Sequence, residues 1–398
     1  MTREKQDKLI FTFCLIDMLF LPYFPLITVA YSMPLVYFWW LCRRRSLRKV
    51  PEYKLILIAI TMISVSTVFS YVQFPSNIKD NTVYLLEMSA VFLYYIMFKY
   101  YVDNYDVDLE KWLFLFVLFV GAFAVIYNVD KAMYQSLKYI WNARMGTAWS
   151  TTAFRGYRFG FVWMDENNIA YMINTIAFFL IVSTRVSSIK KLIVFGVNLL
   201  VVISTMSNGG RNSLILVWLA YLPYLLFHNR RIRNPFRRYV SVHSIVSFVV
   251  IVALICIAAK YIPQYFNSTV FLESQERVSE NSLESRLSIW TSVAEGANWL
   301  QCILWGSGGR TMVAGVPRAP HNGHFYWILS FGMIVYVIYM YIFFRKRRNV
   351  AYKDWLSIFP FFLGFSINTM VGEPKVNEII AVLVAYMSSP IYREKIRN

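Results

Sequence analysis

The chain has 398 residues, of which 58% are hydrophobic, and its formal charge at neutral pH is +18. This apolar fraction, with a mean hydropathy of +0.46, excludes a soluble protein of two or three domains. The positive charge does not indicate nucleic-acid binding, because most Lys and Arg residues lie in short segments beside long apolar runs. We therefore expect a membrane protein that binds no nucleic acid.

The long apolar runs recur along the whole chain. Backbone amides in lipid must be paired within their own segment, so each run is predicted to be a transmembrane helix. The sequence thus predicts an all-α, polytopic membrane protein, with residues 1–398 forming one membrane domain of about twelve helices. The predicted spans are 9–24, 26–42, 54–74, 82–102, 112–128, 167–183, 191–206, 213–228, 245–262, 325–344, 355–371 and 378–391.

Charge at the flanks of the spans predicts their orientation. Arg3, Lys5 and Lys8 precede the apolar run 9–42, and a cluster that begins at Arg43 follows it. Because positively charged flanks remain in the cytoplasm, the run should fold as a hairpin of two spans. The same rule predicts that both termini of the chain are cytoplasmic.

Two segments on the outer side are long, and the rest are short turns. These long loops are 129–166 and 263–324. The inside loop 103–111 is acidic, but acidic residues weigh little in the positive-inside rule, so the predicted orientation stands.

The first long loop ends in polar residues just before a predicted helix. Arg155 and Arg158 carry guanidinium groups whose geometry matches phosphate oxygens. Asp165 and Asn168 follow, at the helix N-terminus. Two interpretations remain open, because the arginines could instead bind lipid headgroups and Asp165 could cap the helix.

A short outside turn, residues 205–213, contains Gly209, Gly210 and Arg211 between two apolar helices. Glycine exposes backbone amides, a helix N-terminus favours negative charge, and Arg211 adds a full positive charge. The turn is therefore a candidate anion site. A plain helix turn with an arginine extending to the membrane surface explains it equally well.

The second long loop is predicted to contain a surface helix over 282–300, because its apolar residues recur at helical spacing. Arg286 lies in the first turn of that helix. Two further arginines, Arg310 and Arg318, follow it in the same loop. All three are candidates for binding phosphate.

Two of the four histidines of the chain, His321 and His324, lie at the end of the second long loop. An imidazole near neutral pKa is suited to deprotonate a hydroxyl group. His321, between Pro320 and Asn322, is the better candidate for a catalytic base. For His324 a purely structural hydrogen bond is an equal alternative. The loops contain no cluster of metal-ligand residues, so no metal site is predicted.

The order of these motifs resembles that of the bacterial O-antigen polymerase and O-antigen ligase superfamily. The features that carry the resemblance are the number of spans, about twelve, and four motifs between about residues 155 and 345. These motifs are the Arg158–Asn168 segment, the Ser207–Arg211 turn, the Arg286–Trp290 helix leading to Gly306 and Gly308, and the His321–Asn322 pair ahead of Gly332. The resemblance implies a GT-C-like glycosyltransferase of the inner membrane that needs no cofactor.

The resemblance also implies a reaction at the periplasmic face. A polymerase would transfer the growing glycan from undecaprenyl diphosphate onto an incoming lipid-linked repeat unit. Arg158, Arg211 and Arg286 would stabilise the diphosphate leaving group, and His321 would orient or deprotonate the acceptor hydroxyl. Membrane lipid and a chain-length regulator are the other partners that it implies.

Three alternatives remain beside the polymerase. In a ligase the glycan would pass to lipid A core; the His321–Asn322 pair and Gly332 fit that motif, but Val335 stands where a Gly, Thr or Tyr is expected. A lipid-linked oligosaccharide flippase would carry charges within its spans. There the sequence offers few candidates: Asp17, Glu87 and Lys260. A non-catalytic assembly component would use the loop arginines for binding alone.

Overall fold

The computed structural model is helical almost throughout. It describes residues 3–23, 30–73, 78–141, 158–161, 163–228, 287–307, 312–313, 316–317, 322–348, 350–367 and 374–392. The only strands among these residues are β1 (Met312–Val313) and β2 (Val316–Pro317), which pair as a short antiparallel ladder. The prediction of an all-α protein is confirmed for the described part of the chain.

The described helices span most of the chain. In chain order they are α1 (Arg3–Phe20), α2 (Met33–Leu47), α3 (Tyr53–Gln73), α4 (Ile78–Asn104), α5 (Leu109–Val129), α6 (Lys131–Trp141), α7 (Glu166–Val182), α8 (Ser188–Thr205), α9 (Asn208–His228), α12 (Trp299–Leu304), α13 (Gly323–Phe343), α14 (Tyr352–Leu356), α15 (Phe359–Ile367) and α16 (Pro374–Met387). Residues 287–296 form a further helix.

Five of these helices are long and apolar enough to cross a membrane. They are α3, residues 81–104 of α4, α5, α8 and α13. The apolar helix α7 is slightly shorter. These helices are those of a membrane-embedded protein. The predicted span 245–262 lies outside the described residues.

The chain begins with a helical hairpin, as predicted, but its helices are shifted from the predicted spans. α1 begins at Arg3 and ends at Phe20, and α2 begins only at Met33. Asp7, in the charged first turns of α1, accepts hydrogen bonds from Trp39 Nε1 at 2.9 Å and Arg43 Nη2 at 3.0 Å. These contacts to α2 stabilise the polar start of α1.

Two other predicted helices are interrupted. The span 355–371 is divided into α14 and α15, where Pro360 occupies the first turn of the new helix, a position that needs no N–H donor. The surface helix 282–300 is divided at Asn298, whose side chain caps α12 by accepting from Gln301 N at 3.3 Å. The short helix α6, within the first long loop, was not predicted.

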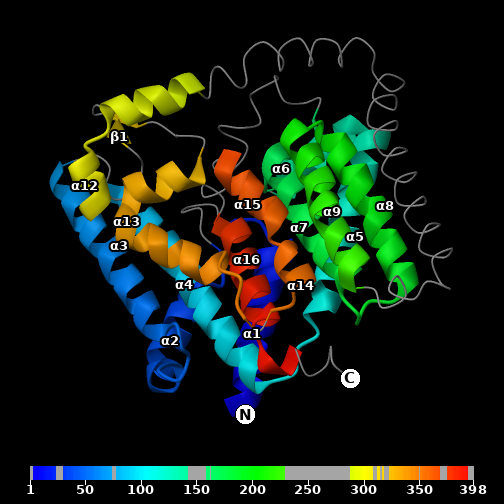
Figure 1. Cartoon of the computed structure of the whole chain (residues 1–398), viewed down its shortest axis with the longest axis horizontal. Helices are drawn as coiled ribbons and strands as arrows, with labels where there is room; N and C mark the ends of the chain where they lie inside the picture. The colour runs from blue at the N-terminus through cyan, green and yellow to red at the C-terminus, as the bar shows by residue number, and fades with distance from the viewer. Residues whose placement is uncertain are drawn as a thin grey trace.

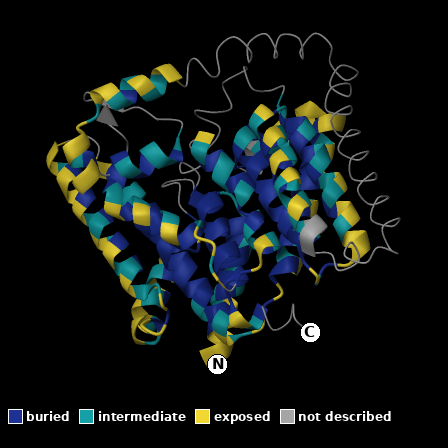
Figure 2. Ribbon diagram, viewed as in Figure 1, coloured by how far each residue is buried: buried dark blue, intermediate teal, exposed yellow. Residues whose placement is uncertain are grey.

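The most buried helices lie at the centre of the molecule. Every residue of α16 is buried, and this helix packs against α4 and α1 (Figures 1 and 2). The peripheral helices instead expose apolar side chains, such as Val72 of α3 at 79% and Leu192 of α8 at 72%. Such apolar surfaces are suited to contact with lipid.

The two ends of the helix assembly carry different elements. In Figure 1, α1 begins and α16 ends at the bottom, whereas α6 and helix 287–296 lie toward the top.

Candidate functional site

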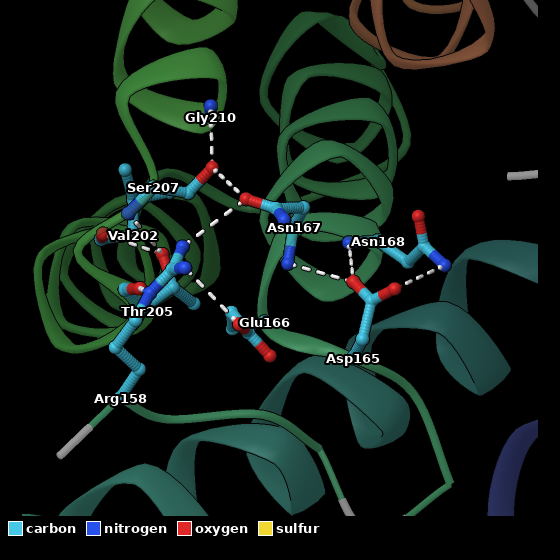
Figure 3. Close-up of polar contacts among 9 residues, drawn as sticks. All are labelled: Arg158, Asp165, Glu166, Asn167, Asn168, Val202, Thr205, Ser207 and Gly210. Atoms are coloured by element: carbon cyan, nitrogen blue, oxygen red, sulfur yellow. Dashed lines mark hydrogen bonds and ion pairs between the residues drawn. The ribbon is translucent and has the colours of Figure 1, made fainter. Parts of the chain in front are cut away.

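Two segments that the sequence singled out meet in space. The end of the first long loop packs against the C-terminus of α8, where Phe159 N donates to Ser204 O at 3.0 Å. Arg158 Nε donates to Thr205 O at 2.9 Å. Residues 158–168 and the turn 205–211 therefore form one junction, at the N-termini of α7 and α9 (Figure 3).

Arg158 is bonded to protein groups within this junction. Its Nη1 lies 3.0 Å from Glu166 Oε1, and its Nη2 donates to Asn167 Oδ1 at 3.1 Å. The side chain of Arg158 is 16% exposed and that of Glu166 is 6% exposed. The charge of Arg158 is thus compensated by Glu166, so this guanidinium fastens the loop to α7 rather than standing free for a phosphate.

Asp165 caps α7. Its Oδ1 accepts from the backbone N–H groups of Asn167 at 2.8 Å and Asn168 at 2.7 Å. The side chain of Asn168 donates to Asp165 Oδ2 at 3.0 Å. Of the two interpretations of Asp165, capping is the one that these contacts show. Asn168 is buried beside it and supports the cap.

The turn between α8 and α9 is tightly bonded. Met206 has a left-handed backbone with φ 50°, which reverses the chain at the end of α8. Ser207 Oγ donates to Asn167 Oδ1 at 2.9 Å and accepts from Gly210 N at 3.1 Å. Arg211 N donates to Ser207 O at 3.0 Å. The amides of residues 210 and 211 are therefore occupied and do not form an anion-binding nest.

Close packing explains the glycines of this turn. A side chain at Gly210 would collide with Ala170 of α7, and one at Gly209 would collide with the Tyr171 ring. The absence of side chains lets α9 approach α7 closely. The same contact is supported by Asn174, whose Nδ2 donates to Gly210 O and Ser213 Oγ, both at 2.8 Å.

Arg211 differs from Arg158. Its guanidinium is half-buried and donates to the neutral Asn208 side chain. No ion pair within the described ranges involves Arg211, whereas Arg158 is paired with Glu166. Burial lowers the pKa of Arg211, yet an arginine remains protonated at neutral pH. Among the described residues, Arg211 is therefore a positive charge without a carboxylate partner, beside a junction that is otherwise internally bonded.

His324 is held at the beginning of α13. Its Nδ1 lies 3.0 Å from Tyr336 Oη, and its Nε2 lies 2.9 Å from Ser366 Oγ. The ring also packs edge-on against Phe365. Both ring nitrogens are therefore bonded to hydroxyl groups of the protein. These two hydroxyl groups, from α13 and α15, fix the orientation of the His324 ring.

Asn322 positions the start of the same helix. Its Oδ1 accepts from His324 N at 2.9 Å and from Phe325 N at 3.1 Å, which caps α13. Its Nδ2 donates to Ser366 O at 2.9 Å. These bonds fix the residue that follows His321 against the end of α15.

The glycines Gly306 and Gly332 have a structural role. Gly332 has φ 88° and interrupts α13. A Cβ atom added at Gly332 would lie 3.0–3.2 Å from Leu304 O and the backbone of Trp305. Gly306, with φ 73°, approaches the backbone of Ser330 and Phe331 more closely still, since an added Cβ would lie 2.4–2.5 Å from it. Both positions need φ values that side-chain-bearing residues rarely adopt.

Carbonyl groups released by the break in α13 find partners in neighbouring elements. Ser307 N donates to Leu329 O at 2.7 Å, and Ser66 Oγ of α3 donates to Ser330 O at 2.8 Å. An interrupted helix can persist in a membrane protein because such bonds replace the missing helical ones.

The remaining predicted site residues lie outside the described residues. They are Arg155, Arg286, Arg310, Arg318 and His321. No group of three or more His, Cys, Asp or Glu side chains that could hold a metal ion occurs in the described part of the chain.

The sequence did not reveal a buried ion pair at the centre of the molecule. Lys375 Nζ lies 2.9 Å from Asp17 Oδ1, and both side chains are 0% exposed. Asp17 lies within a predicted span, but Lys375 lies in the short turn predicted between spans 355–371 and 378–391. The one available signal is its place three residues before the predicted span that begins at residue 378.

A comparison of the chain with protein-family models and with curated proteins finds no match.

Proposed function

We propose that this chain is a metal-independent glycosyltransferase of the O-antigen polymerase type, in the inner membrane of a bacterium. It would transfer a growing undecaprenyl-diphosphate-linked polysaccharide onto an incoming lipid-linked repeat unit. In this proposal the GT-C-like fold has twelve spans, both termini lie in the cytoplasm, and the reaction occurs at the periplasmic face.

The observation that carries the proposal is the charge of Arg211. It lies at one end of the helix assembly, at the junction of residues 158–168 with the turn 205–211, and the ion pairs of the described residues leave it without a carboxylate. A lipid-linked diphosphate would present its anionic group at this depth, with its hydrocarbon chain beside the apolar helices. Arginine binds phosphate oxygens in a bidentate manner.

The other groups have distinct roles in the proposed reaction. As the glycosyl bond to the diphosphate breaks, negative charge builds up on the leaving group, and Arg211 with Arg286 would stabilise it. His321 would accept the proton of the acceptor hydroxyl while the new glycosidic bond forms. Arg158 and Asp165 would shape the junction through the contacts described above. Arg155, Arg310, Arg318 and His324 complete the set of candidate substrate-binding residues.

Reconstitution tests the proposal. Purified full-length protein in lipid vesicles would be incubated with undecaprenyl-diphosphate-linked repeat units, with and without a lipid A core acceptor. A ladder of products without the core acceptor supports the polymerase, and a single transfer to the core supports the ligase. If neither product forms while the protein remains folded, the proposal of a glycosyltransferase is contradicted.

The Arg211→Ala and His321→Ala variants locate the activity. Both should lose the ladder while the folded protein is retained. Arg345→Ala is the matched control, because Arg345 is an exposed arginine whose one partner among the described residues is Tyr341. Its ladder should equal that of the unmodified protein.

A flippase is the second candidate, and the buried Asp17–Lys375 pair favours it, because ionisable side chains inside a span are typical of transporters. In cells that lack the protein, lipid-linked single units that accumulate on the cytoplasmic side of the membrane would support a flippase. Units that reach the outer side but are not joined would support the polymerase.

A further inference from the structure

Three ionisable side chains meet at the centre of the helix assembly. Asp17 comes from α1, and Lys375 and Glu378 come from the first turns of α16. Their exposed fractions are 0%, 0% and 1%. Taking a charge out of water costs several kcal/mol per ion, so the net charge of this cluster must be close to zero.

Lys375 and Asp17 form a pair whose atoms are fully bonded. Beside Asp17 Oδ1, the ammonium of Lys375 donates to Asp17 O at 2.8 Å, Leu21 O at 2.9 Å and Pro22 O at 3.1 Å. Asp17 Oδ2 accepts from Ser32 N at 2.5 Å. Lysine at the C-terminus of α1 is also favoured by the helix dipole. One positive and one negative charge thus cancel.

Glu378 is the carboxyl group that remains. Its Oε2 is buried and has no hydrogen-bond partner among the described residues. The titratable groups of the described residues that surround it are Asp17 and Cys14 of α1, Tyr94 of α4 and Lys375, and Tyr339 of α13 contacts the preceding residue, Asn377. The hydroxyl of Tyr94 is engaged with Ser32 Oγ at 2.5 Å, and that of Tyr339 with Asn377 Oδ1 at 2.9 Å.

Counting charges gives the state of Glu378. With both carboxyl groups ionised, the cluster would carry one net negative charge in a region that excludes water. With one proton added, the net charge is zero. Asp17 holds the lysine, so the proton belongs on Glu378.

We propose that Glu378 is a proton-binding site in the core of this protein, occupied at neutral pH because the Asp17–Lys375 pair leaves no positive charge to balance a second carboxylate. Binding converts the Glu378 carboxylate and one proton from water into a neutral carboxylic acid. The site is independent of the proposed glycosyl transfer. Ionisable groups at this depth mark proton and ion pathways in membrane proteins, and this site gives the chain such an element.

A proton fits this position better than a metal ion. Alkali and alkaline-earth cations need several oxygen ligands. The oxygens of Asp17 are already bonded to Lys375 and Ser32. Nor does any group of three His, Cys, Asp or Glu side chains surround Glu378 within the described ranges.

Infrared spectroscopy of the full-length protein in lipid vesicles tests the proposal, because a protonated carboxyl group has its own C=O stretching band. At neutral pH, Glu378→Gln should remove one such band and leave the melting temperature unchanged, since the amide resembles the neutral acid. A spectrum that does not change would show that Glu378 is ionised and would overturn the proposal. So would a protein that no longer folds, because a neutral side chain would then not be tolerated.

Asp17→Asn tests the charge balance, which simple burial of Glu378 would not predict. In this variant Lys375 needs a new counter-charge, so Glu378 should ionise and the same band should disappear. A band that persists in folded Asp17→Asn protein would overturn the link between the two carboxyl groups. If Asp17→Asn does not fold, Lys375→Met is tested instead. In this variant the C=O band of protonated carboxyl groups should gain intensity. An unchanged intensity would overturn the link between the Asp17 and Glu378 carboxyl groups.

A sodium series distinguishes the proton from a metal ion. Replacing potassium by sodium at constant pH should leave the Glu378 band unchanged. Loss of the band with rising sodium would show that a metal ion displaces the proton, and would overturn the assignment of a proton-specific site.

Discussion

The two ends of the helix assembly use their charges differently. Where α1 begins and α16 ends, four cations are paired with carboxylates: Arg43 with Asp7, Lys99 with Asp103, Arg185 with Glu110 and Arg347 with Glu52. At the other end Arg158 is paired with Glu166, whereas within the described ranges the Arg211 side chain donates to Asn208 and to no carboxylate. The comparison separates cations that are paired with carboxylates from one that has no such partner in the part of the chain that the structure describes.

The acidic loop 103–111 belongs to the first group. Glu110 is buried and receives Arg185 Nη1 at 3.1 Å and the Tyr386 hydroxyl at 2.6 Å. Burial lowers the pKa of Arg185, but Glu110 together with Tyr386, Asp108 and Asp106 raises it overall. Two of the acidic residues of this loop, Asp103 and Glu110, are thus partners of the cations Lys99 and Arg185.

The centre of the molecule gives the most severe test of this comparison. Lys375→Ala should lower the free energy of unfolding by about 3–5 kcal/mol, because it leaves Asp17 as a buried charge without a counter-charge. Thermal or denaturant unfolding in detergent measures the loss. Lys346→Ala is the control, since Lys346 is exposed. Equal stability of the two variants would show that the central pair does not hold α16 to α1.

Arg158→Ala should cost about 2–3 kcal/mol of stability, because Glu166, Asn167 and Thr205 O all lose a charge-assisted partner. Arg158→Lys should recover part of this, since lysine keeps the charge but not the planar fork. Unfolding curves measure both. If Arg158→Ala kept full stability and lost ligand binding, Arg158 would belong with Arg211 instead.

Asp354 is a buried carboxyl group at the ion-paired end, and burial raises its pKa from 3.8 to about 6. The buried site disfavours the charged form, so this group destabilises the fold above pH 6. That penalty disappears as the pH falls from about 6 to 4. It amounts to about 2–3 kcal/mol.

The stability of the unmodified protein, followed by thermal unfolding across this pH range, should therefore contain a component that rises on acidification. Asp354→Asn should remove that component. The same pH profile in both proteins would contradict the assignment.

Gly332→Ala should cost about 1–2 kcal/mol, because φ 88° is unfavourable for alanine and the added methyl group meets Leu304 O. Gly196→Ala in α8 is a matched control: a Cβ there meets no atom within 4 Å, and alanine favours a helix. It should keep or slightly raise the melting temperature. A similar drop for both variants would argue against strain at the break in α13.

Some of this organisation is legible in the sequence because it depends on neighbouring residues. The spans at 54–74, 82–102 and 112–128 agree with α3, α4 and α5 to within a few residues, since apolar length alone defines a span. Capping of α7 by Asp165 was one of the two interpretations open beforehand, because a cap acts over three residues.

Contacts between distant segments could not be predicted in the same way. Asp17 and Lys375 are separated by 358 residues in the sequence, and nothing local to either residue specifies the other. Likewise Glu166 follows Arg158 closely in sequence, but only the fold of the junction shows that it neutralises the arginine. The sequence therefore identified charged positions without telling which were already paired.

Binding of undecaprenyl diphosphate to the full-length protein tests the central claim most directly. The affinity would be measured for the unmodified protein, for Arg211→Ala and for Arg345→Ala, whose arginine lies at the opposite end and also lacks a carboxylate partner among the described residues. We predict that Arg211→Ala weakens binding about tenfold or more and that Arg345→Ala binds as the unmodified protein does. Equal affinities for all three proteins would contradict the account.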